Sequence, residues 1–387
     1  MLTKNINFKN FVIKIKKFQI SEKLRLLLKQ NNPILNTLSP EYKYSYNNRI
    51  ISKFKKSSNF TLIGMGGSIL GAEAIFDFLK YKLKKNFLFL NNIDSNLITS
   101  NKKKNNVNLI ISKSGNTLET IVNAKIFIRK KDKNIFITEH TNSYLLNLGK
   151  KIKAEIIEHR NYIGGRYSVL SEVGMLPAEL MGLNEKKFKQ FNNLVKNKKF
   201  LNSLVYNVES ILNFIKKDKF TSIILNYDER SDNLFKWYQQ LVAESLGKKS
   251  KGILPIISSM PKDNHSLMQL YLDGPRKSFY TFFNVFNKQS IKIKSKELFS
   301  KSKHIVSKDL NKIIYSQKIA TENVFKIKKI PFRSFEIFNR DEKTLGELFT
   351  FFILESILLG RALEVNPFDQ PSVELIKKET RKILIKN

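Results

Sequence analysis

Short apolar runs alternate along the first half of the chain with longer stretches in which apolar residues recur every three or four positions. The short runs predict buried strands and the longer periodic stretches predict helices. Strands that alternate with helices in this way predict βαβ units and therefore a parallel sheet. We expect strands at residues 60–66, 87–92, 107–113, 134–139 and 154–159, and helices at 68–84 and 118–131.

The same alternation begins again after a long helical stretch at 167–217. It predicts strands at 220–227, 252–257 and 279–286, a helix at 233–249, and closing helices at 344–363 and 372–385. We therefore expect an α/β protein with two doubly wound parallel sheets, flanking helices and C-terminal helices. The expected division is an N-terminal helical segment (1–45), a first sheet domain (46–185), a second sheet domain (186–345) and the C-terminal helices (346–387).

The composition fits an ordinary globular protein, because 42% of the 387 residues are hydrophobic and 26% are charged. No cysteine is present, which excludes disulfides and thiol nucleophiles. The four histidines lie far apart, so we expect neither a metal nor a redox cofactor. The strongest apolar run, 348–360, is interrupted by Glu355 and is shorter than the roughly 20 residues that span a bilayer. We expect a soluble, cytoplasmic protein that binds no membrane.

The formal charge of +36 first suggests a nucleic-acid-binding protein. The lysines, however, are scattered along the chain together with many asparagines and isoleucines, which is typical of a biased coding composition. We therefore expect no specific binding of nucleic acid. A positive field would still attract a phosphorylated substrate.

Two turns at the ends of predicted strands have the composition of phosphate-binding sites. GMGGSILGA (64–72) includes Gly67 and Ser68, and its glycines allow backbone N–H groups to approach an anion. A plain tight turn is the alternative. ISKSGNTLET (111–120) gathers hydroxyls around a helix start, and the alternative there is N-capping by Ser114 or Thr117. Its candidate phosphate ligands are Ser112, Lys113, Ser114 and Thr117.

The second turn resembles the phosphosugar-binding turn of sugar isomerase (SIS) domains. Further segments resemble the glucose-6-phosphate isomerase family, and they occur in the family's order. GGRYSVLSEVGMLPAEL (164–180) resembles its arginine signature, and QQLVAESLGKKSKGILPI (239–256) resembles the segment of its catalytic glutamate. DNHSLMQLYLDGP (263–275) resembles its histidine segment, and EVNPFDQPSVELIKKETRK (364–382) resembles its C-terminal signature.

The resemblance implies a role for each matching residue. Glu244 would be the base that moves a proton between C1 and C2, and Arg166 would stabilise the enediolate. His265 and Lys377 would open the sugar ring, and Gln370 would contact substrate hydroxyls or phosphate. On a helical wheel Lys377 lies close to an apolar stripe, so we expect it to face inward.

The implied function is the reversible isomerisation of glucose 6-phosphate to fructose 6-phosphate in glycolysis and gluconeogenesis, without a cofactor. The resemblance also implies a homodimer in which His265 acts across the interface. A dual glucose/mannose phosphate isomerase and a non-catalytic phosphosugar-binding regulator remain as alternatives. Ser372 stands where the family signature usually has glycine, which leaves the start of the last helix open.

Overall fold

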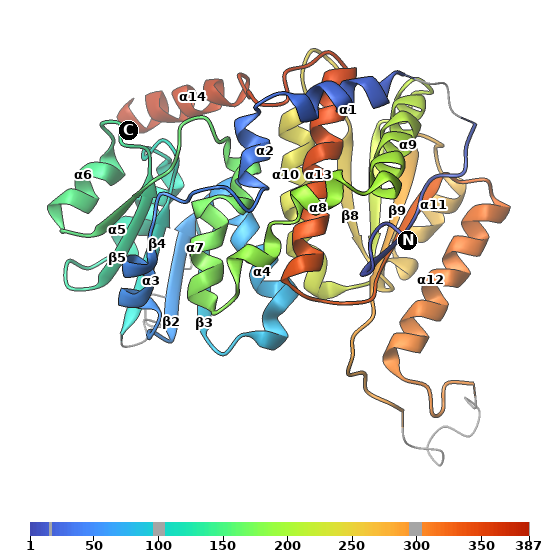
Figure 1. Cartoon of the computed structure of the whole chain (residues 1–387), viewed down its shortest axis with the longest axis horizontal. Helices are drawn as coiled ribbons and strands as arrows, with labels where there is room; N and C mark the ends of the chain where they lie inside the picture. Colours follow the sequence, from blue (N-terminus) through green and yellow to red (C-terminus); the bar gives the residue numbers. More distant parts are fainter. Residues whose placement is uncertain (15–17, 96–104, 294–303, 387) are drawn as a thin grey trace.

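The computed structural model describes residues 1–14, 18–95, 105–293 and 304–386. Within these ranges the chain forms two five-stranded sheets that lie beside each other, with helices on both faces of each (Figure 1). The first sheet is entirely parallel. Its strand order is β3 (Asn86–Leu90), β2 (Asn59–Gly64), β4 (Asn106–Ile111), β5 (Lys133–Thr138) and β6 (Glu155–Glu158).

The second sheet is parallel except for one edge strand. Its order is β1 (Ile6–Lys9), β10 (Phe332–Ile337), β9 (Ser278–Val285), β7 (Thr221–Asn226) and β8 (Leu254–Ser259). β1 pairs with β10 in antiparallel orientation, with Ile6 opposite Ile337. The prediction of an α/β fold with two wound sheets is confirmed, and one antiparallel edge strand is added to it.

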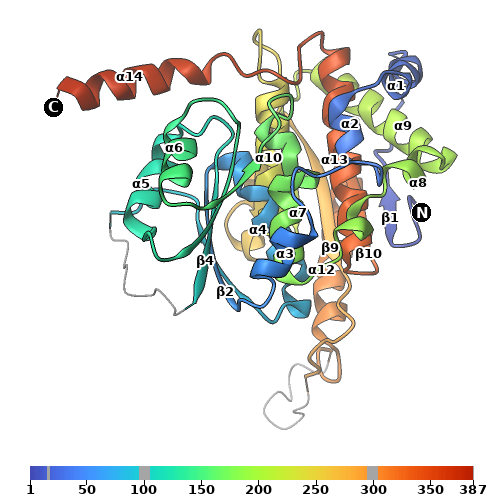
Figure 2. The same ribbon diagram turned by 60° about the vertical axis from the view of Figure 1, so that its left-hand side comes forward.

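Helices cover both faces of the first sheet because its strands alternate apolar side chains between the faces. In β2, Phe60 and Leu62 pack toward one face and Ile63 toward the other. The helices on the first face, seen edge-on in Figure 2, are α3 (Asn48–Phe54), α4 (Leu70–Leu79) and α7 (Glu172–Met181). Those on the second face are α5 (Leu118–Phe127) and α6 (Tyr144–Lys151).

The second sheet is covered in the same way. Its first face packs against α9 (Lys198–Ile215), α10 (Asp232–Leu246) and α13 (Glu342–Ala362), and its second face against α11 (Met268–Asp273) and α12 (Leu310–Ile327). The remaining helices are α1 (Ile20–Lys29), α2 (Pro33–Thr37), α8 (Phe191–Val195) and α14 (Val373–Lys386). α10 also contacts α4, so it joins the two halves. In the described ranges, no helix has the length and apolarity needed to cross a membrane.

Two strands were not predicted, β1 and β10. The first 45 residues were expected to be helical, yet they contain β1 as well as α1 and α2. β10 was missed because charged residues interrupt its apolar pattern. Its Arg333 is fully buried and forms an ion pair with the equally buried Glu355 of α13, which makes this polar position compatible with a central strand.

The expected domain boundaries stay predictions, and the one at 345/346 falls within α13.

His159, directly after β6, is a fully buried histidine whose Nε2 has no hydrogen-bond partner. Burial lowers its pKa to about 4. Between pH 6.5 and pH 4 the unfolded chain therefore binds a proton that the folded chain does not, and the free energy of unfolding falls as the pH falls. We expect His159 to account for a loss of about 3 kcal/mol by pH 4.

Urea unfolding of wild type and His159→Gln at several pH values measures this effect. The variant should lose less stability than wild type between pH 6.5 and pH 4, whatever its stability at neutral pH. The exposed His140 provides the matched control, His140→Gln, which should keep the wild-type slope. Equal slopes in wild type and His159→Gln would show that His159 is not a buried neutral group.

Candidate active site

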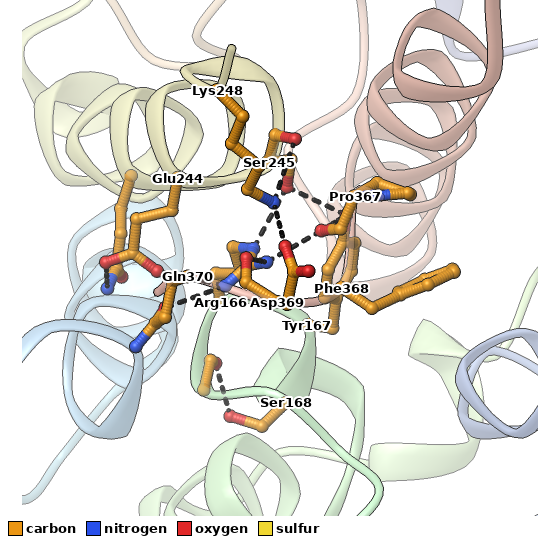
Figure 3. Close-up of polar contacts among 12 residues, drawn as sticks. Arg166, Tyr167, Ser168, Glu244, Ser245, Lys248, Pro367, Phe368, Asp369 and Gln370 are labelled. Atoms are coloured by element: carbon orange, nitrogen blue, oxygen red, sulfur yellow. Dashed lines mark hydrogen bonds and ion pairs between the residues drawn. The ribbon is translucent and has the colours of Figure 1, made fainter. Parts of the chain in front are cut away.

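Arg166 brings three distant segments of the chain together (Figure 3). It lies at the start of the 3-10 helix Gly165–Leu170, and 1% of its surface is exposed. All of its donor nitrogens have partners on the end of α10 or in the C-terminal loop. Nε donates to Ser245 Oγ (3.0 Å), Nη1 to Glu244 Oε2 (3.2 Å) and Gln370 Oε1 (2.8 Å), and Nη2 to the carbonyls of Pro367 (2.7 Å) and Asp369 (2.9 Å).

Glu244 lies in the last turn of α10 and is held from both sides. Its Oε2 accepts from Arg166, and its Oε1 accepts from Gln240 Nε2 at 2.9 Å. The side chain of Glu244 keeps 26% of its surface exposed, whereas that of Arg166 keeps 1%. A carboxylate that is fixed by two donors and still open to solvent can accept a proton from a bound molecule.

The first glycine turn contacts the backbone of the arginine segment and Gln240, the residue that donates to Glu244. Gly67 packs directly on the backbone of the arginine segment, since a Cβ atom on Gly67 would lie 2.1 Å from the carbonyl carbon of Gly165. Gly66 has a positive φ of 54°, and a Cβ there would lie 2.7 Å from Gln240 Nε2. The turn that carries Gly67 and Ser68 is therefore part of the same site as Arg166 and Glu244.

The second turn follows β4 at the same edge of the first sheet, because β2 and β4 are adjacent and parallel. Ser112 Oγ and Thr117 Oγ1 are 2.9 Å apart. Thr117 is the N-cap residue of α5, but its side chain accepts no backbone hydrogen bond, and Ser114 Oγ accepts only from Asn116 N at 3.3 Å, outside the helix. Neither Ser114 nor Thr117 therefore caps the helix with its side chain, and the hydroxyls of Ser112 and Thr117 bond to each other.

Lys113 lies in this turn, but its side chain is turned to other partners. Nζ donates to the carbonyl of Asn161 at 2.5 Å and lies 3.6 Å from Glu139 Oε1. Part of its charge is therefore neutralised within the protein. Lys113 can add positive potential near the turn. Its ammonium group, however, is directed to Asn161 and Glu139.

His265 lies at the opposite end of the second sheet from Glu244. α10 leads from the carboxyl end of β7 back to the amino end of β8, so Glu244 lies near the amino ends of these strands. His265 follows the carboxyl end of β8, in the 3-10 helix Lys262–His265, and is exposed. The six residues of β8 span about 20 Å. Within a single chain, His265 and Glu244 are therefore far apart.

Lys377 is not brought to the site either. α14 projects away from the rest of the chain, as Figure 2 shows, and has no buried residue. The side chain of Lys377 is 59% exposed and pairs with Glu374. The prediction that Lys377 faces inward is wrong for the single chain, because nothing within the described part of the chain covers the apolar side of α14, where Ile376 is 70% exposed.

Three residues of the site were missed in the sequence, namely Gln240, Ser245 and Tyr167. Gln240 lies one helical turn before Glu244, so the four-residue spacing on a predicted helix could have identified it. Ser245 accepts from Arg166 and shares a 2.8 Å hydrogen bond with the hydroxyl of Tyr167. Both of these partners are buried, and only the folded structure reveals that they support Arg166.

The sequence of this chain is similar to a known protein family and to individual proteins of known name. The model described as phosphoglucose isomerase matches residues 48–387. A glucose-6-phosphate isomerase from Methanocaldococcus jannaschii is 32% identical, over 83% of this chain and 82% of that protein. A glucose-6-phosphate isomerase from Mycoplasmopsis pulmonis is 33% identical, over 93% of this chain and 94% of that protein.

Two solved structures show the same fold. A hypothetical protein from Thermus thermophilus superposes with a TM-score of 0.83 at 23% identity and covers 94% of both chains. A glucose-6-phosphate isomerase from Chlamydia trachomatis superposes with a TM-score of 0.73 at 16% identity, over 87% of this chain and 71% of that one. Together with the match of the family model over most of the chain, the sequence relatives establish that this protein belongs to the phosphoglucose isomerase family.

Proposed function

We propose that the protein catalyses the reversible isomerisation of D-glucose 6-phosphate to D-fructose 6-phosphate, as an enzyme of glycolysis and gluconeogenesis. The observation that carries the proposal is the contact between one carboxylate, Glu244, and one guanidinium, Arg166, beside the glycine turn at Gly67. Moving a proton between C1 and C2 needs a base that reaches both carbons and a positive group near the enediolate oxygens. These residues supply that combination.

The substrate phosphate binds at the second turn, where the hydroxyl groups and the free N–H groups at the start of α5 are available to an anion. The backbone of the first turn contacts the sugar, close to Arg166. Lys113 contributes positive potential from its position beside Glu139. The residues proposed to hold the substrate in this way are Gly67, Ser68, Ser112, Lys113, Ser114 and Thr117.

Glu244 removes the proton from one carbon, holds it, and returns it to the neighbouring carbon. Arg166 stabilises the negative charge of the cis-enediolate in between, and its buried guanidinium is already oriented by five hydrogen bonds. Gln370 accepts a hydrogen bond from the same guanidinium, which leaves its amide nitrogen for substrate hydroxyls. No step in this scheme requires a cofactor.

His265 and Lys377 open the sugar ring before the proton is moved. We propose that the working unit is a cytoplasmic homodimer in which His265 acts in the active site of the neighbouring copy. The separation of His265 from Glu244 by the length of β8 supports action across an interface. The exposed apolar side of α14, which includes Ile376 and Ile383, is consistent with a helix whose packing partner lies outside the single chain.

Mixed dimers test the sharing of the site. Wild type serves as the reference, and Glu244→Gln and His265→Ala are each expected to be almost inactive alone. If His265 acts across the interface, a mixed dimer contains one intact site, and random pairing restores about a quarter of wild-type activity. If the mixture remains as inactive as the two single variants, His265 does not act in the neighbouring site.

A methyl group at Gly67 is expected to disturb the contact between the first turn and the arginine segment. In Gly67→Ala the new Cβ would meet backbone atoms of Gly165 and Arg166 at 2.1 and 2.5 Å, so one segment has to move. We expect kcat/KM to fall by about a hundredfold, since a displacement of about 1 Å in a catalytic site has an effect of this size. Steady-state kinetics with fructose 6-phosphate measures it.

Gly164→Ala is the matched control, because a Cβ at Gly164 would find its nearest neighbour at 3.7 Å, an ordinary van der Waals distance. This variant should keep wild-type kinetics. Equal effects of the two substitutions, or none from Gly67→Ala, would show that the close approach of Gly67 does not matter for the reaction.

A further inference from the structure

The loop that carries Gln370 has no regular secondary structure of its own. Residues 364–371 connect α13 to α14 without helix or strand hydrogen bonding. Glu364 at its start has a positive φ of 58°. Within the loop, Asn366 accepts from Phe368 N and donates to Asp369 Oδ2. Side chains from elsewhere also hold the loop, and Arg166 does so through the carbonyls of Pro367 and Asp369.

Lys248 also holds this loop, and Figure 3 shows its ammonium group beside Asp369. Its Nζ lies 2.8 Å from Asp369 Oδ1, and it donates to the carbonyls of Asn366 and, at 3.3 Å, Ser245. These three acceptors satisfy all three donors of an ammonium group. Only 12% of the side chain is exposed. The ion pair lowers the pKa of Asp369, so this carboxylate stays charged.

The turn that presents Lys248 has an unusual backbone for its sequence. Lys248 N donates to Lys251 O (3.1 Å) and Lys251 N to Lys248 O (2.9 Å), which closes a turn with Lys249 and Ser250 at its centre. Both central residues have a left-handed backbone conformation, with φ of 53° and 57°. Turns of this kind favour Asn-Gly, and non-glycine residues keep such a conformation where surrounding contacts hold it.

The second flanking lysine of this turn also reaches the loop region. Lys251 Nζ donates to the carbonyl of Leu363 at 2.8 Å, directly before the loop begins. The turn at 248–251 therefore places two lysine side chains on the backbone that leads to Gln370. It also begins two residues after α10 ends and four residues after Glu244, so it links the two parts of the site.

We infer that Lys248 is a positioning residue that holds the loop 364–371 in the conformation in which Gln370 Oε1 accepts from the same Arg166 nitrogen that donates to Glu244. The inference rests on the function proposed above. Without Lys248 the loop samples other conformations, and only a fraction of the molecules is competent to bind substrate. The apparent affinity then falls by that fraction, whereas kcat is retained once substrate has ordered the loop.

Kinetics of Lys248→Met and Lys249→Met test this inference. Lys249 is the next residue in the same turn and is exposed, so its replacement removes the same charge without touching the loop. We expect Lys248→Met to raise KM for fructose 6-phosphate at least about tenfold, with kcat within about threefold of wild type. Lys249→Met should leave both constants near their wild-type values.

Hydrogen exchange of the amides in 364–371 provides a readout that does not depend on turnover. Exchange should be faster in Lys248→Met than in wild type and Lys249→Met, and bound substrate should reduce the difference. Equal KM values and equal exchange in the two variants would overturn the inference. A loss of kcat with unchanged KM would also overturn it, because Lys248 would then act in the transition state.

The same experiments separate this inference from the proposed function. If wild type shows no isomerase activity, the proposed function fails, and hydrogen exchange alone then decides whether Lys248 holds the loop. Faster exchange in Lys248→Met than in wild type would support the positioning role, and unchanged exchange would contradict it.

Discussion

Replacing Glu244 by glutamine is expected to lower kcat for fructose 6-phosphate by about a thousandfold or more, within the range typical for loss of a general base. The substitution keeps the shape of the side chain, and its remaining oxygen can still accept from Arg166. Its amide nitrogen then faces Gln240 and can donate to Gln240 Oε1 once that amide rotates. The change removes the negative charge and the ability to take a proton. KM should therefore change little, and a coupled assay of glucose 6-phosphate formation measures both constants.

Two further variants show whether this loss is specific. Glu229→Gln removes an exposed carboxylate just before α10 and should retain wild-type kinetics. Glu244→Asp keeps a carboxylate but withdraws it by one methylene, so its activity should lie between wild type and Glu244→Gln. A Glu244→Gln enzyme that retains kcat within about threefold of wild type would exclude Glu244 as the base.

Arg166→Lys is expected to have the second largest effect, although it preserves the charge. A lysine ammonium has three donors and no planar fork, so it cannot replace five hydrogen bonds that reach two separate segments. We expect kcat to fall by about a hundredfold to a thousandfold, as for loss of a donor that stabilises the transition state. KM should also rise, because the carbonyls of Pro367 and Asp369 lose their partner.

Thermal unfolding accompanies the kinetics of this variant, since the buried guanidinium also supports the fold. Arg129→Lys, at an exposed position, is the control and should match wild type in both measurements. If Arg166→Lys is folded and keeps its kcat, charge alone is sufficient at this position and the hydrogen-bonded geometry is not required.

The sequence predicted those parts of the fold and site that depend on local patterns. The strand predicted at 60–66 is β2, and the predicted glycine turn follows it at Gly66–Ser68. A short apolar run that ends in glycine is a strong local signal for a buried strand followed by a turn. β10 was missed because Arg333 belongs to a buried ion pair whose partner, Glu355, lies on another element. Local periodicity carries no information about such a partner.

The convergence of Arg166, Glu244 and Gln370 is likewise not contained in any local pattern. The arginine and the glutamate are separated by 78 residues, and the arginine and the glutamine by 204. For Lys377, the helical wheel predicted a position near apolar residues, but a wheel does not tell whether that side of the helix is covered. In the single chain it is not, as the exposure of Ile376 shows.

Isomerisation of fructose 6-phosphate in D₂O, followed to equilibrium by NMR with mannose 6-phosphate monitored separately, tests the central claim most directly. A base that holds the proton between C1 and C2 exchanges part of it with solvent. The account predicts that wild type forms glucose 6-phosphate, that the product carries deuterium at C2, and that Glu244→Gln does neither. Absence of conversion by folded wild type, or conversion without deuterium at C2, would contradict proton transfer by Glu244.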